Sequence, residues 1–266
     1  MRWSTTRSYA PHRVACAACR QPGGVNPLGR APVWPERPAR SDMVPMAHDI
    51  LPADPDLPLL HTRNYEVKSF LKDENTVLIR GAVMDRKPGG LYVPDDDEPL
   101  VMHHMIVDLT VAYPQMEIID AAVVFEAHPH TTCTNIVDHY QKLIGLNIAR
   151  GFTHRIRELF GGPRACTHTT ALIQAMAPVA VQTIWSMQAV RAKVTGASFS
   201  ESVTPEERKR SLAMNLNTCH VWAEDGPNMS LINAGEELPP PLQIVRRYRE
   251  LGLDASGWSE TMRPKG

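Results

Sequence analysis

The sequence predicts an α+β fold, in which an antiparallel meander sheet of about four strands packs against three or more helices. Segments with strand composition come first, over residues 65–127, and segments with helical spacing of apolar residues follow from residue 133 onward. Alternation of apolar and polar residues in the strands indicates a sheet with one face against a core and the other in solvent.

Four segments have strand composition and rough alternation, at residues 65–71, 76–84, 101–112 and 117–127. In the third of these, a two-residue period places His103 on one face of the sheet with apolar neighbours. His104 and Asp108 then lie on the opposite face.

Apolar residues three or four positions apart predict the helices. The first begins after Cys133, the second ends at Gly161-Gly162-Pro163, and the third runs from Thr167 to about Lys193. We expect Pro178 to kink the third helix. The side chains expected to face the core are Ile136, Tyr140, Leu143 and Ile144 in the first helix, Phe152, Ile156, Leu159 and Phe160 in the second, and Leu172, Ile173, Met176, Ala180 and Ile184 in the third.

Three later features are also expected. Thr204-Pro205-Glu206-Glu207 has the residues of a helix start, and residues 216–223 resemble a short strand that holds Cys219 and His220. An exposed basic helix is expected near residues 242–251. We therefore predict one domain over residues 59–235 and a peripheral tail over residues 236–266.

Residues 1–58 differ from the rest, because they are rich in Arg and Pro and contain no lysine. We expect this extension to be disordered. It is also Arg-rich and acid-poor, as targeting peptides are, although its prolines disfavour an amphipathic helix. A start of the natural chain at Met43 or Met46 is the remaining interpretation.

Composition limits the partners that we expect. The chain has 266 residues, of which 43% are hydrophobic and 21% charged, and a formal net charge of −1. No basic stripe suggests nucleic acid as a partner, and no apolar run approaches the roughly 18 residues of a membrane helix. An odd number of cysteines, five, and no apolar signal segment predict a reducing, cytoplasmic location. A small-molecule substrate is the partner that remains.

Cysteine and histidine occur together at three places in the predicted domain. Cys133 follows His128 and His130, Cys166 lies two residues before His168, and Cys219 directly precedes His220. Thiolate and imidazole are the ligands that zinc prefers. Both Cys133 and Cys166 also precede predicted helices, whose N-terminal field favours thiolate over thiol.

A buried His103 would need a partner for its ring nitrogens, either a metal ion or a backbone carbonyl. If the three cysteines converge, a metal is the natural partner. The predicted metal ligands are therefore His103, Cys133, Cys166, His168, Cys219 and His220, with zinc expected and iron or an iron–sulfur cluster as the alternative. Simple packing of the cysteines in the core is the structural alternative.

Four further residues are candidates for catalysis. A His104–Asp108 pair in a wet cleft would transfer protons. Arg80 and Lys87, which flank the junction between the second strand and the following loop together with Asp85, form a group that would bind an anionic substrate. Solvated side chains and a surface salt-bridge cluster are the corresponding structural alternatives.

Three functions fit these residues. The first is a zinc-dependent hydrolase or lyase that acts on a small anionic organic substrate. The second is a non-catalytic carrier or scaffold for a metal or an iron–sulfur cluster. The third is an enzyme with Cys166 as its nucleophile, used together with His168 or His220 and without a metal.

Six motifs carry a resemblance to a known family. In order they read Asp85-Arg86-Lys87, His103-His104-Met105, Cys133, Leu143-Ile144-Gly145-Leu146, Cys166-Thr167-His168 and Cys219-His220. With this combination, residues from about His61 to His220 resemble the bacterial domain-of-unknown-function family 2889. Ala165 stands where that family usually has glycine. The resemblance implies no activity, and it implies that the motif residues are the ones to test.

A second, more distant resemblance is one of layout. The order of strands, a cysteine before a helix and a later Cys-His pair is similar to that of iron–sulfur cluster scaffold proteins. It implies the carrier function named above.

Overall fold

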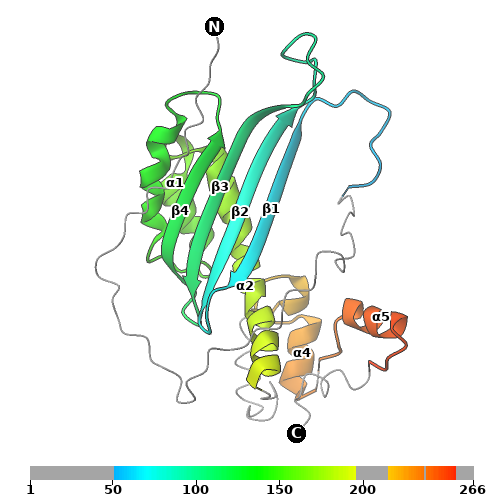
Figure 1. Cartoon of the computed structure of the whole chain (residues 1–266). Helices are drawn as coiled ribbons and strands as arrows, with labels where there is room; N and C mark the ends of the chain where they lie inside the picture. Colours follow the sequence, from blue (N-terminus) through cyan, green and yellow to red (C-terminus); the bar gives the residue numbers. More distant parts are fainter. Residues whose placement is uncertain (1–50, 196–214, 237, 256–266) are drawn as a thin grey trace. The chain divides into compact units, whose positions relative to one another are not determined.

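A computed structural model of the chain describes residues 51–195, 215–236 and 238–255 (Figure 1). The predicted helix start at Thr204-Pro205-Glu206-Glu207 and most of the predicted N-terminal extension lie outside the described residues. Among the described helices, none combines the length and the apolar character that crossing a membrane requires.

The sheet has four antiparallel strands in the order β1-β2-β3-β4, which confirms the predicted meander and the α+β fold. Its strands are β1 (Thr62–Leu71), β2 (Thr76–Lys87), β3 (Leu100–Ala112) and β4 (Glu117–Ala127). Strands that are hydrogen-bonded to each other in the sheet are also consecutive in the sequence, so one direct connection joins each pair. The longest connection, between β2 and β3, contains the Gly89-Gly90 pair and the acidic run that follows it.

One face of the sheet carries the hydrophobic core. Alternate residues of β2 and β3, such as Ile79 and Leu109, have no exposed surface. Helix α2 (Thr167–Thr195) packs against β1, β2 and β3, and it lies behind the sheet in the view of Figure 1. Pro178 lies inside α2, which continues past it to Thr195. The predicted inward residues Leu172, Ile173, Met176 and Ala180 are fully buried, and Ile184 is partly buried against the core.

Two shorter helical segments complete the core. The 3₁₀ helix η2 (Cys133–Leu143) packs against β4, and α1 (Phe152–Phe160) packs against α2. Their inward residues agree with the predicted faces except at Ile144, which is 43% exposed because η2 ends at Leu143 and the backbone of Ile144 is extended. A short 3₁₀ turn, η3 (Gly162–Arg164), connects α1 to the start of α2.

The C-terminal part contains η5 (His220–Trp222), α4 (Pro227–Ala234) and α5 (Leu242–Glu250). The helix predicted near residues 242–251 is confirmed as α5. The strand predicted for residues 216–223 is wrong. The Trp222 amide donates to the Cys219 carbonyl and the Asn217 amide donates to the Trp222 carbonyl. This segment therefore closes on itself in a turn and pairs with no strand in the part of the chain that the structure describes.

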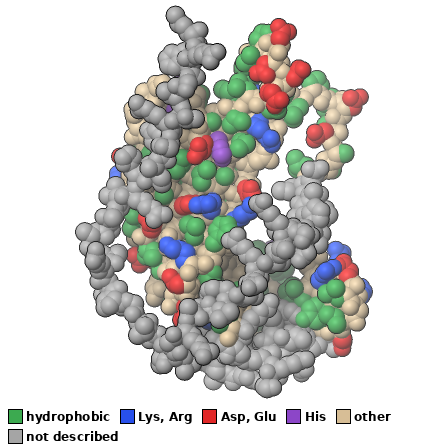
Figure 2. Space-filling view, in the orientation of Figure 1, with side chains coloured by type: hydrophobic (Ala, Val, Ile, Leu, Met, Phe, Trp, Pro, Cys, Tyr) green, Lys and Arg blue, Asp and Glu red, His purple; other side chains and the backbone are tan. Residues whose placement is uncertain are grey.

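The second face of the sheet is more polar. Figure 2 views the molecule with this face toward the reader and shows acidic, basic and hydrophobic side chains intermixed over the strands. Arg80 and Asp108 are cross-strand partners on it, and both nitrogen–oxygen distances of their bidentate pair fall between 2.6 and 2.8 Å. Partly exposed apolar residues such as Phe70 and Val124 share the face.

Candidate active site

The registers of β1, β2 and β3 bring three polar residues into one row on the core face of the sheet. Arg63 pairs with Asp85 across β1 and β2, and Asp85 pairs with His103 across β2 and β3. This row lies at the end of the sheet where β2 finishes and where β1 and β3 begin. The start of α2 reaches the same point and adds Cys166 and His168.

Asp85 is the centre of the cluster. Its carboxylate is almost fully buried, with 1% of the residue exposed. Arg63 donates two hydrogen bonds to it, from Nε to Oδ1 at 2.6 Å and from an Nη atom to Oδ2 at 2.7 Å. These hydrogen bonds are the main reason why the pKa of the Asp85 carboxyl falls to about 2, and they outweigh the opposing effect of burial. A buried anion is thereby kept charged.

Two histidines contact the same carboxylate oxygen. His103 Nδ1 lies 3.1 Å from Asp85 Oδ2, and His168 Nε2 lies 3.2 Å from it. The two imidazole rings stack on each other, with centroids 3.9 Å apart and planes 25° apart. His61 approaches the other oxygen, with 3.5 Å between its Nε2 and Oδ1.

Burial lowers the pKa of His168 below its ordinary value, and the nearby His103 and Arg63 lower it further. The charge of Asp85 acts in the opposite direction but is the smaller influence. This shift favours the neutral imidazole of His168. If its Nε2 donates to Asp85, its Nδ1 carries the lone pair.

The free nitrogen of His168 faces a thiol. Cys166 Sγ lies 3.6 Å from His168 Nδ1. The Cys166 carbonyl accepts the first helical hydrogen bond of α2, from the Thr170 amide, so the thiol stands at the N-terminus of a 29-residue helix. The buried Tyr140 fixes the position of the Cys166 backbone, because the Cys166 amide donates to the Tyr140 hydroxyl oxygen at 3.1 Å. A continuous chain of contacts runs from thiol to imidazole to carboxylate.

Asp85, His103 and His168 also form a group that could hold a metal ion. One ligand atom from each lies within 4.8 Å of the other two. Of the six predicted ligands, the fold brings His103 and His168 together and places Cys166 beside them. Metal identity and the full ligand set stay predictions.

The remaining predicted ligands are outside that group of described residues. Cys133 opens η2 and is half-buried against the core. Cys219 is exposed and directly precedes η5, which His220 begins.

The predicted catalytic residues are placed elsewhere. His104 and Asp108 lie on the sheet face opposite to His103, as alternation predicts. Arg80 pairs with Asp108, which corresponds to the surface salt-bridge alternative. Lys87, at the end of β2, lies over the ring of Tyr92, with Nζ 5.7 Å from the ring centroid. Catalytic roles for these four residues stay predictions.

No site role was predicted for Arg63, His61 or Tyr140. Arg63 carried a usable signal, because a two-residue period places it on the same face as Val67 and Leu71. A charged residue on a core face needs a buried partner. Asp85 was predicted only as part of a group at the strand-to-loop junction that binds an anionic substrate, and not as a partner of Arg63.

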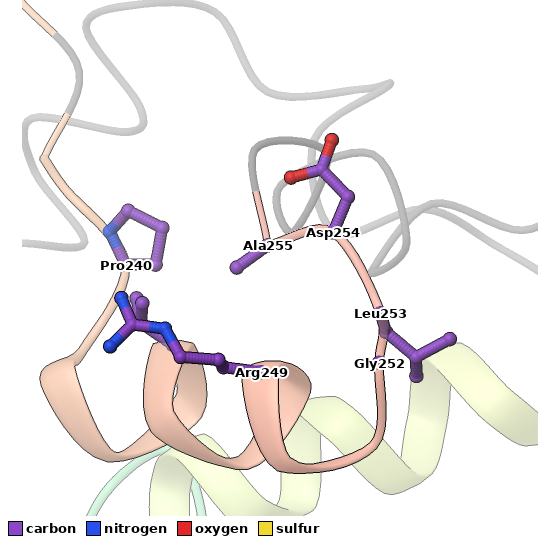
Figure 3. Close-up of a pocket in the computed structure, with 7 residues that line it drawn as sticks. Pro240, Arg249, Gly252, Leu253, Asp254 and Ala255 are labelled. Atoms are coloured by element: carbon purple, nitrogen blue, oxygen red, sulfur yellow. The ribbon is translucent and has the colours of Figure 1, made fainter.

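A pocket lies in the C-terminal segment and contains none of the cluster residues. Figure 3 shows that residues from both ends of α5 line it. These residues are Pro240, Val245, Arg249, Gly252, Leu253, Asp254 and Ala255.

Comparison with known proteins identifies one family. Residues 61–182 match the model of a family described as a protein of unknown function, DUF2889. Searches of curated proteins and of solved structures found no match. Asp85, His103, Cys166 and His168, which belong to three of the motifs that carry the family resemblance, all lie in the cluster and within the matched range. Residues 61–182 thus match the DUF2889 family, as their motifs predicted.

Proposed function

We propose that the protein is a cysteine-dependent hydrolase of acyl compounds, with Cys166 as nucleophile, His168 as general base and Asp85 as the group that orients the base. One observation carries this proposal. The chain from Cys166 Sγ to His168 Nδ1, 3.6 Å, continues from His168 Nε2 to Asp85 Oδ2, 3.2 Å. A thiol is activated when a base lies next to it and a third group fixes the tautomer of that base.

The chemistry follows from the positions of the protons. His168 Nδ1 takes the Sγ proton as Sγ bonds to the acyl carbon, and the leaving group departs with that proton, so that a thioester forms on Cys166. Water then attacks the thioester while His168 takes a proton from it. The acid is released, and the proton returns to Cys166.

Two features of the surroundings suit such a reaction. The first amide groups of α2 lack acceptors within the helix, and groups of this kind stabilise an oxyanion that develops beside them. The Arg63 side chain is 37% exposed and has N–H groups beyond the two that bind Asp85, which suits an acyl compound with an anionic or polar group.

The zinc-dependent hydrolase or lyase predicted from the sequence would use His103 and His168 as ligands. The stacked rings of His103 and His168 would have to turn before both could bind one ion, which favours a thiol enzyme over one that depends on a permanently bound zinc. The carrier function predicts exposed ligands, whereas the Asp85 carboxylate is buried. Both functions stay predictions, and assays with and without a chelator separate them from the thiol enzyme.

The test is selective alkylation with iodoacetamide, read at each cysteine by peptide mass spectrometry. We expect Cys166 to react at least about tenfold faster than the exposed Cys219, and His168→Gln to remove this advantage. Hydrolysis of p-nitrophenyl acyl esters should be lost in Cys166→Ser and unchanged in Cys219→Ser. Equal alkylation of Cys166 and Cys219, with no effect of His168→Gln in a protein of native circular dichroism, would contradict the proposal.

A further inference from the structure

The two histidines and Asp85 already have the spacing of metal ligands. Zinc binds carboxylate oxygen and imidazole nitrogen at about 2.0–2.2 Å, so neighbouring ligand atoms around one ion lie roughly 3–3.5 Å apart. Asp85 Oδ2 is 3.1 Å from His103 Nδ1 and 3.2 Å from His168 Nε2. The same contacts that orient the base are therefore the edges of a candidate coordination site.

We propose that this site takes a divalent transition-metal ion, zinc being the natural probe, on Asp85, His103 and His168, and that the bound ion switches off the thiol of Cys166. The reason is the tautomer of His168. A neutral imidazole carries one proton, so a ring that binds the ion through Nε2 carries that proton on Nδ1. Nδ1 is the nitrogen that faces Cys166 Sγ, and in this state it has no lone pair to accept the thiol proton.

The ion is expected to exchange rather than to stay bound. Arg63 already neutralises Asp85 through two hydrogen bonds, so a divalent ion would add uncompensated charge next to a guanidinium. The stacked rings of His103 and His168 must also turn before both nitrogens meet one ion. Side chains that are 21% and 19% exposed give the ion a route to both rings. These features suit a reversible inhibitory ion better than a permanent structural one.

His61 provides the matched control. It contacts Asp85 through Oδ1 at 3.5 Å, as a histidine of the same cluster, but it lies outside the group of three ligand atoms. His61→Asn should therefore keep the zinc effect. His103→Asn should lose it, because His103 is a ligand but has no place in the chain from thiol to carboxylate.

The experiment uses the full-length protein after chelator treatment and gel filtration, titrated with zinc alone. Zinc affinity is measured by calorimetry, and alkylation of Cys166 by iodoacetamide is measured with and without saturating zinc. We expect zinc to slow alkylation of Cys166 at least tenfold in the wild type and in His61→Asn, and less than twofold in His103→Asn. Cys133, which opens η2 without a place in the metal group, is the internal control and should react at the same rate throughout.

A second variant distinguishes two ways in which zinc could protect Cys166 from alkylation. The ion could bind to Sγ itself, or it could remove His168 as the base. Cys166→Ser should bind zinc within about threefold of the wild-type affinity, and cobalt(II) bound to the wild type should show no thiolate-to-metal charge-transfer band. Loss of zinc binding in Cys166→Ser, or protection of Cys166 that persists in His103→Asn, would overturn the proposed ligand set. Zinc that raises ester hydrolysis would overturn the inhibitory role.

This inference rests on the proposed function. The alkylation rates must therefore distinguish a failure of the thiol enzyme from a failure of the metal inference alone. If the thiol enzyme is wrong, Cys166 reacts slowly in the metal-free protein. If only the metal inference is wrong, Cys166 reacts rapidly and zinc does not change its rate.

Discussion

Gly81 of β2 lies directly beneath Met176 of α2, so closely that a Cβ atom added to the glycine would come within 2.9 Å of the methionine sulfur. Leu172 Cδ1 would be 3.0 Å away. Glycine at this point allows the helix to approach the sheet, and this approach keeps the start of α2 against the polar row at the end of β2. The position of the site therefore depends on packing in the N-terminal part of the helix.

Replacing Gly81 by valine should destabilise the protein by about 1–3 kcal/mol, because the added methyl groups must displace side chains of α2. Gly81→Ala should cost less, since the end of the flexible Met176 side chain can move and the alanine restricts the unfolded chain. Urea unfolding followed by circular dichroism measures both. Equal stability of Gly81→Val and wild type would show that the contact is not close.

Tyr140 should act as a positioning residue for the thiol. Tyr140→Phe removes the acceptor of the Cys166 amide, so we expect alkylation of Cys166 to slow severalfold and the free energy of unfolding to fall by about 1–2 kcal/mol. Tyr113→Phe is the control, because Tyr113 donates a comparable hydrogen bond to the Ala180 carbonyl at 2.7 Å. It should lower stability similarly and leave the alkylation rate of Cys166 unchanged. A matching loss of rate in both variants would indicate a general loss of structure.

The Arg80–Asp108 pair should behave as a surface ion pair. Both side chains are partly exposed, so a double-mutant cycle with alanine should give a coupling of at most about 1 kcal/mol that weakens in salt. Neither variant should change ester hydrolysis by more than about twofold. A tenfold loss of activity would instead support the catalytic role predicted for these residues.

Arg63→Ala leaves the buried Asp85 without its main partner. The free energy of unfolding should therefore fall by more than about 2 kcal/mol.

Tyr113 gives the protein a defined weakness at alkaline pH. Burial raises the pKa of its hydroxyl to about 12, from an ordinary value of 10.0. The unfolded chain therefore ionises first as pH rises, and stability falls between these two values by roughly 1.4 kcal/mol for each pH unit. Tyr113→Phe lacks this group. It should be about 1 kcal/mol less stable than wild type at pH 8, and the difference should shrink by about 1 kcal/mol at pH 11. Denaturant titrations at the two pH values measure it, and a constant difference would contradict the assigned pKa.

The sequence allowed the sheet to be predicted closely, because a two-residue period in strands such as β3 is a local signal. It also allowed α1 and α2 to be placed, since their apolar spacing and the glycines after Phe160 are local as well. The segment at residues 216–223 was misassigned for a related reason. Its residues favour a strand, but strand formation needs a neighbouring strand, and the segment instead closes on itself in the turn around Cys219.

The sequence by itself determined the four strands and the helices α1, α2 and α5, the face on which His103 lies, and the closeness of Cys166 to His168, since all of these follow from local spacing. Only the tertiary structure decided that Asp85 joins them and that Arg63 keeps its carboxylate charged. Strand register and the docking of α2 make these contacts between residues up to 83 positions apart, from Asp85 to His168. Such contacts depend on side-chain packing across the whole core, which no local pattern of residues encodes.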